Sequence, residues 1–294
     1  MLKTIAIIPA YNEAENIALV VGGLLELLDH KGSLLIQEVI VADNGSEDAT
    51  AAMAIAAGAT VLRVAGRGYG NACAAACALA STRPHADVLL FADGDHTADL
   101  SEATLLLDAI ASGADLAIGV RTRIAQGSLT LAQRWGNALA CFLVRRLWRI
   151  PISDLGPFRA IRRSAYERMS MRDRAYGWTV EMQIRAAQLH LTTTEVAVSW
   201  LARHAGHSKI SGTLSGVMGA ARGILSMIAR LWWREWREWR EWREWQARHG
   251  ASPLCPAVVA NTVAILPAGQ AQLTYPPRRQ HSNQTSGVHH VVTK

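Results

Sequence analysis

Two aspartates separated by a single glycine, in the stretch FADGDH, are the side chains best suited to chemistry: Asp93 and Asp95. Carboxylates this close repel each other, and one would be driven to its protonated form unless a cation lay between them. Mg²⁺ is typically held by one or two carboxylates together with substrate phosphates. If the segment stays extended, both side chains point to the same side and predict a divalent-metal site. An ordinary Asp-Gly turn is the alternative.

Four more polar stretches each follow a short apolar run, as FADGDH does. They are PAYNE (9–13), DNGSED (43–48), GRGYGN (66–71) and VRTR (120–123). Ligands of parallel sheets bind at the carboxyl ends of the strands. If each apolar run is a strand, the five polar stretches are strand exits at that edge, and together they predict one composite site. Asp43, which opens DNGSED, is a candidate for hydrogen bonding to a nucleoside. Capping of the next helix by Asn44 or Ser46 is the alternative for this stretch.

Phosphate recognition is a further chemistry that these stretches suggest. GRGYGN fails the dinucleotide pattern, because Asn71 stands where a glycine is needed, and it lacks the Gly-Lys-Ser/Thr of a Walker loop. We expect only that small residues such as Gly68 let the chain pass close to a ligand. Three cations in motifs, Arg121, Arg203 and Lys209, are candidates for neutralising a diphosphate. Most of the 30 Lys and Arg are expected to be solvated surface charges.

The first 120 residues alternate between short apolar runs and longer segments rich in Ala and Leu. Runs such as EVIVAD and DVLLFAD predict buried strands, and segments such as EAENIALVVGGLLELL predict helices. This rhythm predicts an α/β fold, with a mostly parallel central sheet flanked by helices. The later part, up to residue 213, is expected to complete the sheet and close over the site, so that residues 1–213 form one domain.

The C-terminal part has a different composition. WREWREWREWREW, residues 233–245, places five tryptophans at a period of three, and we predict an amphipathic Trp- and Arg-rich helix over 214–249. Its indoles would wind roughly 240° around the axis instead of forming one stripe. Such a helix suits a membrane surface, whereas slippage in a repeated stretch of gene is the alternative origin. Residues 250–294 lack Asp and Glu and are rich in proline, which predicts a disordered tail.

The overall composition limits the partners and the compartment. A net charge of +6 favours an anionic partner: phosphate, nucleotide, nucleic acid or a lipid surface. The four cysteines show no disulfide framework, which favours a reducing compartment. There is no run of 18 apolar residues and no signal-peptide pattern. We therefore expect a cytoplasmic protein whose membrane contact, if it has one, is made at the inner surface.

With these motifs assembled, the chain resembles the inverting family 2 glycosyltransferases of GT-A fold, and among them the dolichyl-phosphate mannosyltransferase-like branch and its small bacterial relatives. The matching stretches occur in the expected order between residues 3 and 215. They are IPAYNEAENI, VIVADNGSEDAT, GRGYGNA, FADGDH, DLGPFRAIRR, YGWTVEMQIRAA and RHAGHSKISGT. Two positions depart from the family pattern: Asn44 replaces a second Asp, and Thr97 is a weaker metal ligand than the residue that lipid-phosphate members carry there.

The resemblance implies a role for each motif. Asp93 and Asp95 would hold Mg²⁺ or Mn²⁺ on the diphosphate of a nucleotide-sugar donor. The implied catalytic residues are Asp95, Glu181, Arg203 and Lys209. The implied donor-binding residues are Pro9, Tyr11, Glu13, Asp43, Gly68, Asp93 and Arg121. The implied acceptor wall is Asp154, Gly156, Phe158 and Arg159. Glu181 stands where many members carry the general base for a hydroxyl acceptor; an anionic lipid phosphate needs no base, and Glu181 would then position other groups.

The predicted function is metal-dependent, inverting transfer of a sugar from a nucleotide-diphospho-sugar to a polyprenyl phosphate or a hydroxyl, with no nucleic-acid partner. Two alternatives come from other classes. A sugar nucleotidyltransferase shares the layered core, but should have a glycine-rich loop ending in Arg near its first strand, where this chain has PAYNEAEN. A non-catalytic nucleotide-binding module at a membrane surface would leave the five polar exits unexplained.

Overall fold

The centre of the molecule is a seven-stranded sheet in the order β3-β2-β1-β4-β6-β5-β7. The computed structural model describes residues 2–84, 86–205 and 214–249. The strands are β1 (Thr4–Ala10), β2 (Ile36–Asp43), β3 (Thr60–Arg63), β4 (Val88–Phe91), β5 (Leu116–Ile124), β6 (Arg159–Arg162) and β7 (Thr193–Trp200). β6 is antiparallel to β4 and β5, and the other neighbouring pairs are parallel. The predicted α/β fold with a mostly parallel sheet is confirmed.

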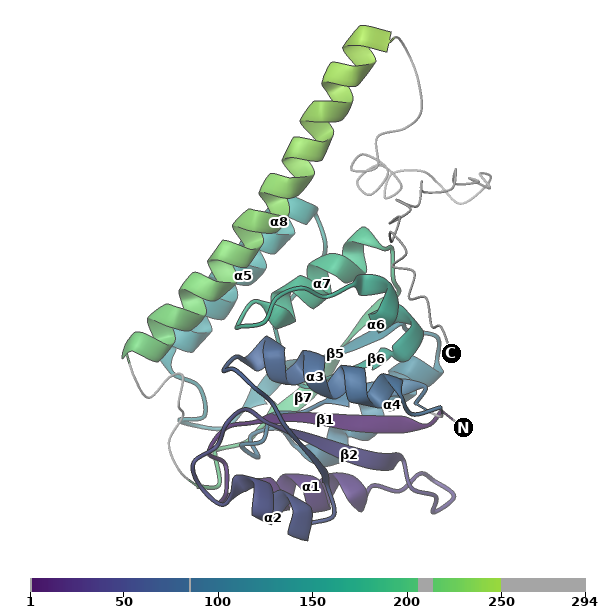
Figure 1. Ribbon diagram of the computed structural model, residues 1–294, viewed down its shortest axis with the longest axis vertical. Helices are drawn as coiled ribbons and strands as arrows, with labels where there is room; N and C mark the ends of the chain where they lie inside the picture. The colour runs from purple at the N-terminus through teal and green to yellow at the C-terminus, as the bar shows by residue number, and fades with distance from the viewer. Residues whose placement is uncertain (1, 85, 206–213, 250–294) are drawn as a thin grey trace, which may run out of the picture.

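Helices cover both faces of this sheet. They are α1 (Ile17–Leu25), α2 (Thr50–Ala56), α3 (Tyr69–Ser81), α4 (Ala103–Ala111), α5 (Leu131–Trp148), α6 (Arg163–Met169), α7 (Trp178–Gln188) and α8 (Leu214–His249), with a 3-10 turn η1 (Leu100–Glu102). In Figure 1, α1 and α2 lie on one side of the sheet, while α3, α6 and α7 lie on the other. The Ala- and Leu-rich segments of the sequence thus form the two outer layers.

The alternation of side chains along the strands divides the core into two layers. In β1, Ala6, Ile8 and Ala10 pack with the helices on one face, whereas Ile5 and Ile7 pack with those on the other. Because both faces are covered, the strand is apolar throughout instead of alternating with polar residues. Burying one such aliphatic side chain contributes about 1.5–3 kcal/mol, so these runs fix the sheet.

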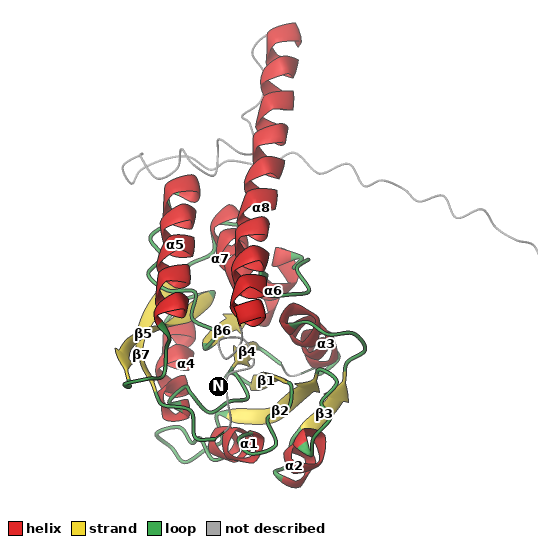
Figure 2. Cartoon of the chain, turned by 90° about the vertical axis from the view of Figure 1, so that its left-hand side faces the viewer, coloured by secondary structure: helices red, strands yellow, loops and turns green. Residues whose placement is uncertain are grey.

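A third apolar cluster joins α8 to the domain. Ile224, Met227, Ile228 and Leu231, at helical spacing, pack against α5 and α7. One turn later, Glu235 accepts a hydrogen bond of 2.9 Å from the indole Nε1 of Trp148 and another from the amide of Gln188. Burial raises the pKa of Glu235. Beyond this anchor α8 continues past the end of α5 and away from the sheet (Figures 1 and 2).

From Trp236 onward the tryptophan repeat lies on this projecting part of α8, and the predicted helix over 214–249 is present. The rings of Trp233 and Trp236 stack with centroids 5.0 Å apart. Arg240 lies over the ring of Trp236, and Arg243 over that of Trp239, one turn along the helix in each case. The repeat is therefore held by local cation–π and stacking contacts. The predicted tail, 250–294, lies outside the described residues, and none of the helices within the described ranges is long and apolar enough to cross a membrane.

The sheet topology brings the polar exits together. β1, β2, β4, β5 and β7 all point the same way, because β6 is the one reversed strand within the described sheet. Their carboxyl ends therefore meet at one edge. The register places Ala10 beside Asp43, so PAYNE and DNGSED begin next to each other. The loops that were expected to form one composite site therefore lie next to one another at this edge.

Candidate active site

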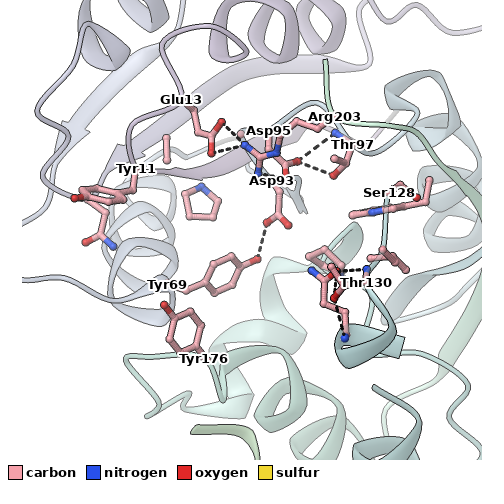
Figure 3. A pocket seen from close by; sticks show the side chains of 18 of the residues that line it. Tyr11, Glu13, Tyr69, Asp93, Asp95, Thr97, Ser128, Thr130, Tyr176 and Arg203 are labelled. Carbon is pink, nitrogen blue, oxygen red and sulfur yellow. Dashed lines mark hydrogen bonds and ion pairs between the residues drawn. The ribbon is translucent and has the colours of Figure 1, made fainter. Parts of the chain in front are cut away.

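A cavity of about 740 Å³ opens at the carboxyl edge of the sheet. Figure 3 shows side chains that line it, which come from the segments after β1, β4, β5 and β7, from the start of α3 and from the loop before α7. The residues expected from the sequence that line it are Pro9, Tyr11, Glu13, Gly68, Asp93, Asp95, Arg121 and Arg203. Donor-side and catalytic residues predicted from five separate motifs thus share one cavity.

β4 ends at Phe91, so Asp93 lies in the loop that follows it and Asp95 lies in the turn that begins at Gly94. Both carboxylates nevertheless line the cavity. The hydroxyl of Tyr69 donates a hydrogen bond of 3.2 Å to Oδ1 of Asp93. Burial, and next the negative charge of Asp95, raise the pKa of Asp93 from 3.8 to about 7. The repulsion expected between the two aspartates is therefore present in the folded chain.

Asp95 is held by a cation and by a hydroxyl. Arg203 donates from one guanidinium nitrogen to Oδ2 of Asp95 at 2.7 Å and from the other to both oxygens of Glu13 at 3.0 Å. Thr97 donates from its hydroxyl to Oδ1 of Asp95 at 2.6 Å. Thr97 is only 5% exposed, so it orients this carboxylate from inside the protein. The segment after β7 is thereby tied to the turn after β4 and to the loop after β1.

These residues fit a divalent cation bound together with a phosphorylated substrate. The carboxylates of Asp93 and Asp95 are hard oxygen donors, and a cation would relieve the repulsion that raises the pKa of Asp93. Within the described ranges, no group of three or more His, Cys, Asp or Glu could enclose a metal ion by itself. Two carboxylates leave coordination positions for diphosphate oxygens and water, as Mg²⁺ sites in nucleotide-dependent enzymes do.

One wall of the cavity suits a flat, polar group such as a nucleobase. Pro9, Tyr11 and Asn44 line it, and the guanidinium of Arg67 lies 4.9 Å from the centroid of the Tyr11 ring. Asp43 itself is buried behind this wall, where its Oδ1 accepts a hydrogen bond of 3.0 Å from the backbone N–H of Ser46. Asp43 thus closes the turn after β2 in this structure, and its expected contact with a nucleoside stays a prediction.

Gly68 brings two distant segments into close contact at the mouth of the cavity. Its φ of +145° is one that side chains rarely adopt, and a Cβ at this position would collide with the carbonyl oxygen of Arg174. Next to it, the N–H of Asn71 donates to the same carbonyl at 3.0 Å, and the N–H of Gly70 donates to Ala175 at 3.1 Å. The start of α3, which carries Tyr69, therefore rests on the loop 172–176.

Glu181 supports this loop from within the protein and does not line the cavity. It is 1% exposed, and its Oε2 accepts hydrogen bonds from the backbone N–H groups of Arg172 (3.0 Å) and Asp173 (2.7 Å). The Nε of Arg185 lies 3.8 Å from its other oxygen. In this structure Glu181 holds the loop 172–176, and its expected role as a general base stays a prediction.

The four residues of the expected acceptor wall are all buried, and Asp154 is the one that holds a cavity residue, Arg121. Asp154 is 4% exposed and holds Arg121: the guanidinium donates to it at 2.8 and 2.5 Å, and the backbone N–H of Arg121 donates at 2.9 Å. Arg121 also lies over the ring of Trp200, 5.3 Å from its centroid. Arg121 thus lines the cavity with its orientation fixed on two sides.

The rest of that segment lies behind the wall. Gly156 has no room for a side chain, because a Cβ would collide with the carbonyl oxygen of Gly119. Phe158 is fully buried, and the guanidinium of Arg159 donates to the carbonyls of Leu155, Gly156 and Thr179. The structure does not bring these side chains to the cavity, where Pro157 stands instead.

Several wall residues were not expected from the sequence. Tyr69, Tyr176, Trp200 and the segment 127–130 with Gln133 all contribute to the cavity. Tyr69 could have been predicted from the sequence, since it lies inside the polar stretch GRGYGN. Tyr176 was indicated only by its place in YGWTVEMQIRAA, one of the stretches that match the family. No local pattern indicated that residues 127–130 line a cavity. Lys209, predicted as catalytic, lies outside the described residues.

A second, mostly apolar groove of about 250 Å³ adjoins the cavity between α5 and α8. The two share Tyr69, Arg121, Gln133, Pro157 and Tyr176. The groove is continued by apolar residues of the two helices, including Leu139, Ile224 and Leu225. The polar cavity thus passes into the apolar groove at Arg121.

The seven-stranded sheet with helices on both faces is the GT-A fold of glycosyltransferases. Among solved structures, glucosyl-3-phosphoglycerate synthase of Mycobacterium tuberculosis has the same fold: its complex with phosphoglyceric acid aligns with a TM-score of 0.59 at 20% identity, over 78% of this chain and 80% of that one. A second complex of that enzyme, with Mn²⁺, uridine diphosphate and its product, aligns with a TM-score of 0.58 at 20% identity over the same shares.

The sequence pattern of Glycosyl transferase family 2 matches residues 5–170, and the chain belongs to this family of glycosyltransferases. An uncharacterized glycosyltransferase of Mycobacterium tuberculosis is 34% identical over 60% of this chain and 79% of its own length. Polyprenol monophosphomannose synthase of Mycolicibacterium smegmatis is 30% identical over 72% and 82%. Undecaprenyl-phosphate mannosyltransferase of Micrococcus luteus is 28% identical over 73% and 90%. Membership of this family favours the predicted glycosyltransferase over both alternatives from other classes.

Proposed function

We propose that this glycosyltransferase moves a sugar from a nucleotide-diphospho-sugar to the phosphate of a polyprenyl phosphate, with inversion and with Mg²⁺ or Mn²⁺. The observation that carries the proposal is the placement of Asp93, Asp95, Arg203 and Arg121 around one cavity at the carboxyl edge of the sheet. Two relatives are named for polyprenol or undecaprenyl-phosphate acceptors, and the fold relative was crystallised with Mn²⁺ and uridine diphosphate.

On the donor side, Pro9 and Tyr11 would hold the nucleoside, and Asp93 and Asp95 would hold the divalent ion. When bound, that ion would offset the negative charge that develops on the departing nucleoside diphosphate. Arg203 lies beside Asp95 and supplies positive charge from the protein itself. An acceptor oxygen attacks the anomeric carbon from the opposite face, and the electron pair of the broken bond leaves with the diphosphate.

The carboxylates of the cavity favour a phosphate acceptor over a hydroxyl. Among the described residues, those that line it are Glu13, Asp93 and Asp95. Glu13 and Asp95 are paired with Arg203, and Asp93 belongs to the metal motif. Glu181 lies in the interior, so none of the four is placed as a base for a hydroxyl. A phosphate oxygen is already anionic and needs no base, and Arg121 stands where the apolar groove begins.

The proposal predicts donor binding that needs the metal and transfer that needs a lipid phosphate. Thermal shift across UDP- and GDP-sugars, with and without Mn²⁺, identifies the donor. Transfer is then measured as labelled sugar recovered in the lipid phase with polyprenyl phosphate. Asp95→Asn should abolish both signals, while Asp108→Asn on the exposed surface of α4 should leave them unchanged. Transfer that resists both EDTA and Asp95→Asn would exclude the metal role.

The place of action that we propose is the inner face of the cytoplasmic membrane, reached by peripheral contact. A polyprenyl phosphate lies in the membrane, and the apolar groove opens from the cavity toward α5 and α8. Fractionation of cells that express the full chain tests this, since recovery in the soluble fraction alone would contradict it.

A further inference from the structure

The outward face of α5 is apolar although it faces solvent. Leu131 and Trp135 are each 75% exposed, Phe142 is 56% exposed and Leu139 is 48% exposed. Their spacing places all four within about 80° of one another around the helix axis. We call this set the α5 stripe. It is a continuous row on one helix and not a scatter of single apolar residues, which would need no explanation.

The core does not account for the α5 stripe. α5 already buries another side, through Ala140, Cys141, Val144 and Trp148 in the cluster shared with α7 and α8. A surface helix normally has one apolar side and a polar opposite side. α5 has apolar residues on both sides, so exposure of the α5 stripe to water is unfavourable, and no contact among the described residues offsets it.

Positive charge surrounds the α5 stripe. Arg134, Arg145, Arg146 and Arg149 are all exposed on or just after α5. The chain contains no Asp or Glu between residues 116 and 153, so no acidic side chain from α5 or its flanking segments balances them. Bulky apolar side chains flanked by arginines are the composition that binds the interface of an anionic bilayer.

The α5 stripe continues toward the catalytic cavity. Leu139 belongs to it and also lines the apolar groove, whose other wall includes Leu225 of α8, itself 38% exposed. One side of the molecule presents α5 and α8 next to each other (Figure 2). At the N-terminal end of α5, Thr130 and Gln133 line the cavity itself. A surface bound along α5 would therefore lie at the open side of the groove.

We propose that the α5 stripe and its arginines form the surface by which this protein docks on an anionic lipid bilayer. This deepens the proposed function, on which it rests, by naming the face that meets the membrane. Charge complementarity selects lipid over a second copy of the chain. Two copies paired through this face would bring Arg134, Arg145 and Arg146 of each against those of the other, whereas anionic headgroups attract them.

Vesicle binding by the full chain tests the proposal. The chain is sedimented with vesicles of phosphatidylcholine alone and of phosphatidylcholine mixed with phosphatidylglycerol. Binding is expected to the mixed vesicles and to weaken as salt is raised. The double variant Leu131→Asp with Trp135→Asp should bind them at least tenfold more weakly, since two apolar anchors are lost. The matched control is Met53→Asp with Ile55→Asp on α2, where both residues are also exposed; it should bind like the parent.

A second pair of variants tests the charge. Arg145→Glu with Arg146→Glu should weaken binding to the mixed vesicles roughly tenfold or more and remove most of its salt dependence. Arg63→Glu with Arg168→Glu makes the same change of charge at exposed positions on β3 and α6, and should have a much smaller effect. Unfolding temperatures of all variants should match the parent, because none of these residues is buried.

Three results would overturn the proposal. One is equal binding by the Leu131/Trp135 variant and the parent. Another is binding that is lost only when Trp232 and Trp233 of α8 are replaced. The third is concentration-dependent self-association that the α5 variants abolish while vesicle binding is unaffected, which would assign the face to a second copy. Donor binding without lipid is measured in parallel, so failure to dock is distinguished from failure of the proposed function.

Discussion

The guanidinium of Arg203 lies 2.7 Å from a carboxylate oxygen of Asp95, and its other nitrogen bridges to Glu13. Arg203, in the segment after β7, thus connects the aspartates after β4 with the PAYNE loop after β1. Glu13 and the Arg203 side chain are largely buried, at 9% and 17% exposed, so this network is protected from screening by solvent. Arg203 thus balances the negative charge of Glu13 and Asp95.

Replacing Arg203 should lower transfer strongly. Arg203→Ala is expected to reduce kcat/KM about 100-fold, the scale on which an oriented electrostatic contact acts in a transition state. Arg203→Lys should recover part of this loss, because it keeps the charge but cannot bridge Glu13 and Asp95 as a planar fork does. Steady-state kinetics below each variant's unfolding temperature measure this. Arg63→Ala, at the exposed end of β3, is the control; a change of less than twofold in Arg203→Ala would refute the role.

Metal binding should depend on pH through Asp93. Its pKa of about 7 in the folded chain lies above the ordinary 3.8, so Asp93 destabilises the fold fully above pH 7; this destabilisation shrinks as the pH falls from 7 and is gone only below 3.8. A proton and a divalent ion compete for this carboxylate. Mn²⁺ should therefore raise the unfolding temperature more at pH 8 than at pH 6, as calorimetry can show. Asp93→Asn should flatten the difference, and an equal Mn²⁺ effect at both pH values would contradict the assignment.

Glu181 should tolerate an isosteric amide. In Glu181→Gln the remaining carbonyl oxygen can still accept from the N–H groups of Arg172 and Asp173, so turnover should stay close to that of the parent. Glu181→Ala leaves both buried N–H groups without this acceptor and should reduce stability by about 1–3 kcal/mol or more. It should also weaken donor binding, since the loop 172–176 supports Tyr69. Denaturant titration and kinetics separate the two effects. A folded Glu181→Gln variant with turnover reduced 100-fold would restore the general-base hypothesis.

Gly68 should not accept a side chain. Gly68→Ala forces a Cβ against the carbonyl of Arg174 at a backbone angle that alanine avoids, so the start of α3 must shift. We expect a loss of about 1–3 kcal/mol in the free energy of unfolding, together with weaker donor binding. Gly22→Ala in the middle of α1, where a Cβ meets nothing within 4 Å, is the control and should be neutral or stabilising. Equal behaviour of the two variants would contradict this account.

The sequence predicted the secondary structure well where its signal was local. Continuous apolar runs predicted β1, β2 and β4, since both faces of a covered sheet need apolar residues. The polar stretch after each run predicted the edge at which the cavity lies. Asp93, Asp95 and Arg203 were therefore found, as was the resemblance to the family to which the chain belongs.

The roles of individual polar residues within those motifs were decided by tertiary packing. Asp43, Glu181 and Arg159 stand in motifs, yet each turns inward and satisfies backbone groups of neighbouring segments. A buried polar group must be paired, and which side of a turn it pairs on depends on the segments that pack there. Those segments are distant in the chain, as the contact between Gly68 and Arg174 shows.

The sequence by itself determined the strands, the helices, the polar exits and the pair of aspartates, because each depends on residues close together in the chain. The tertiary structure alone decided that Tyr69 meets Asp93, that Arg203 reaches Asp95, and that α5 leaves an apolar row in solvent beside the groove. Direction and exposure of a side chain depend on what packs around it, and no local pattern contains that information. The tryptophan repeat on α8 is the most conspicuous pattern in the sequence. The α5 stripe is recognised only in the structure, which shows that the other side of α5 is buried in the core.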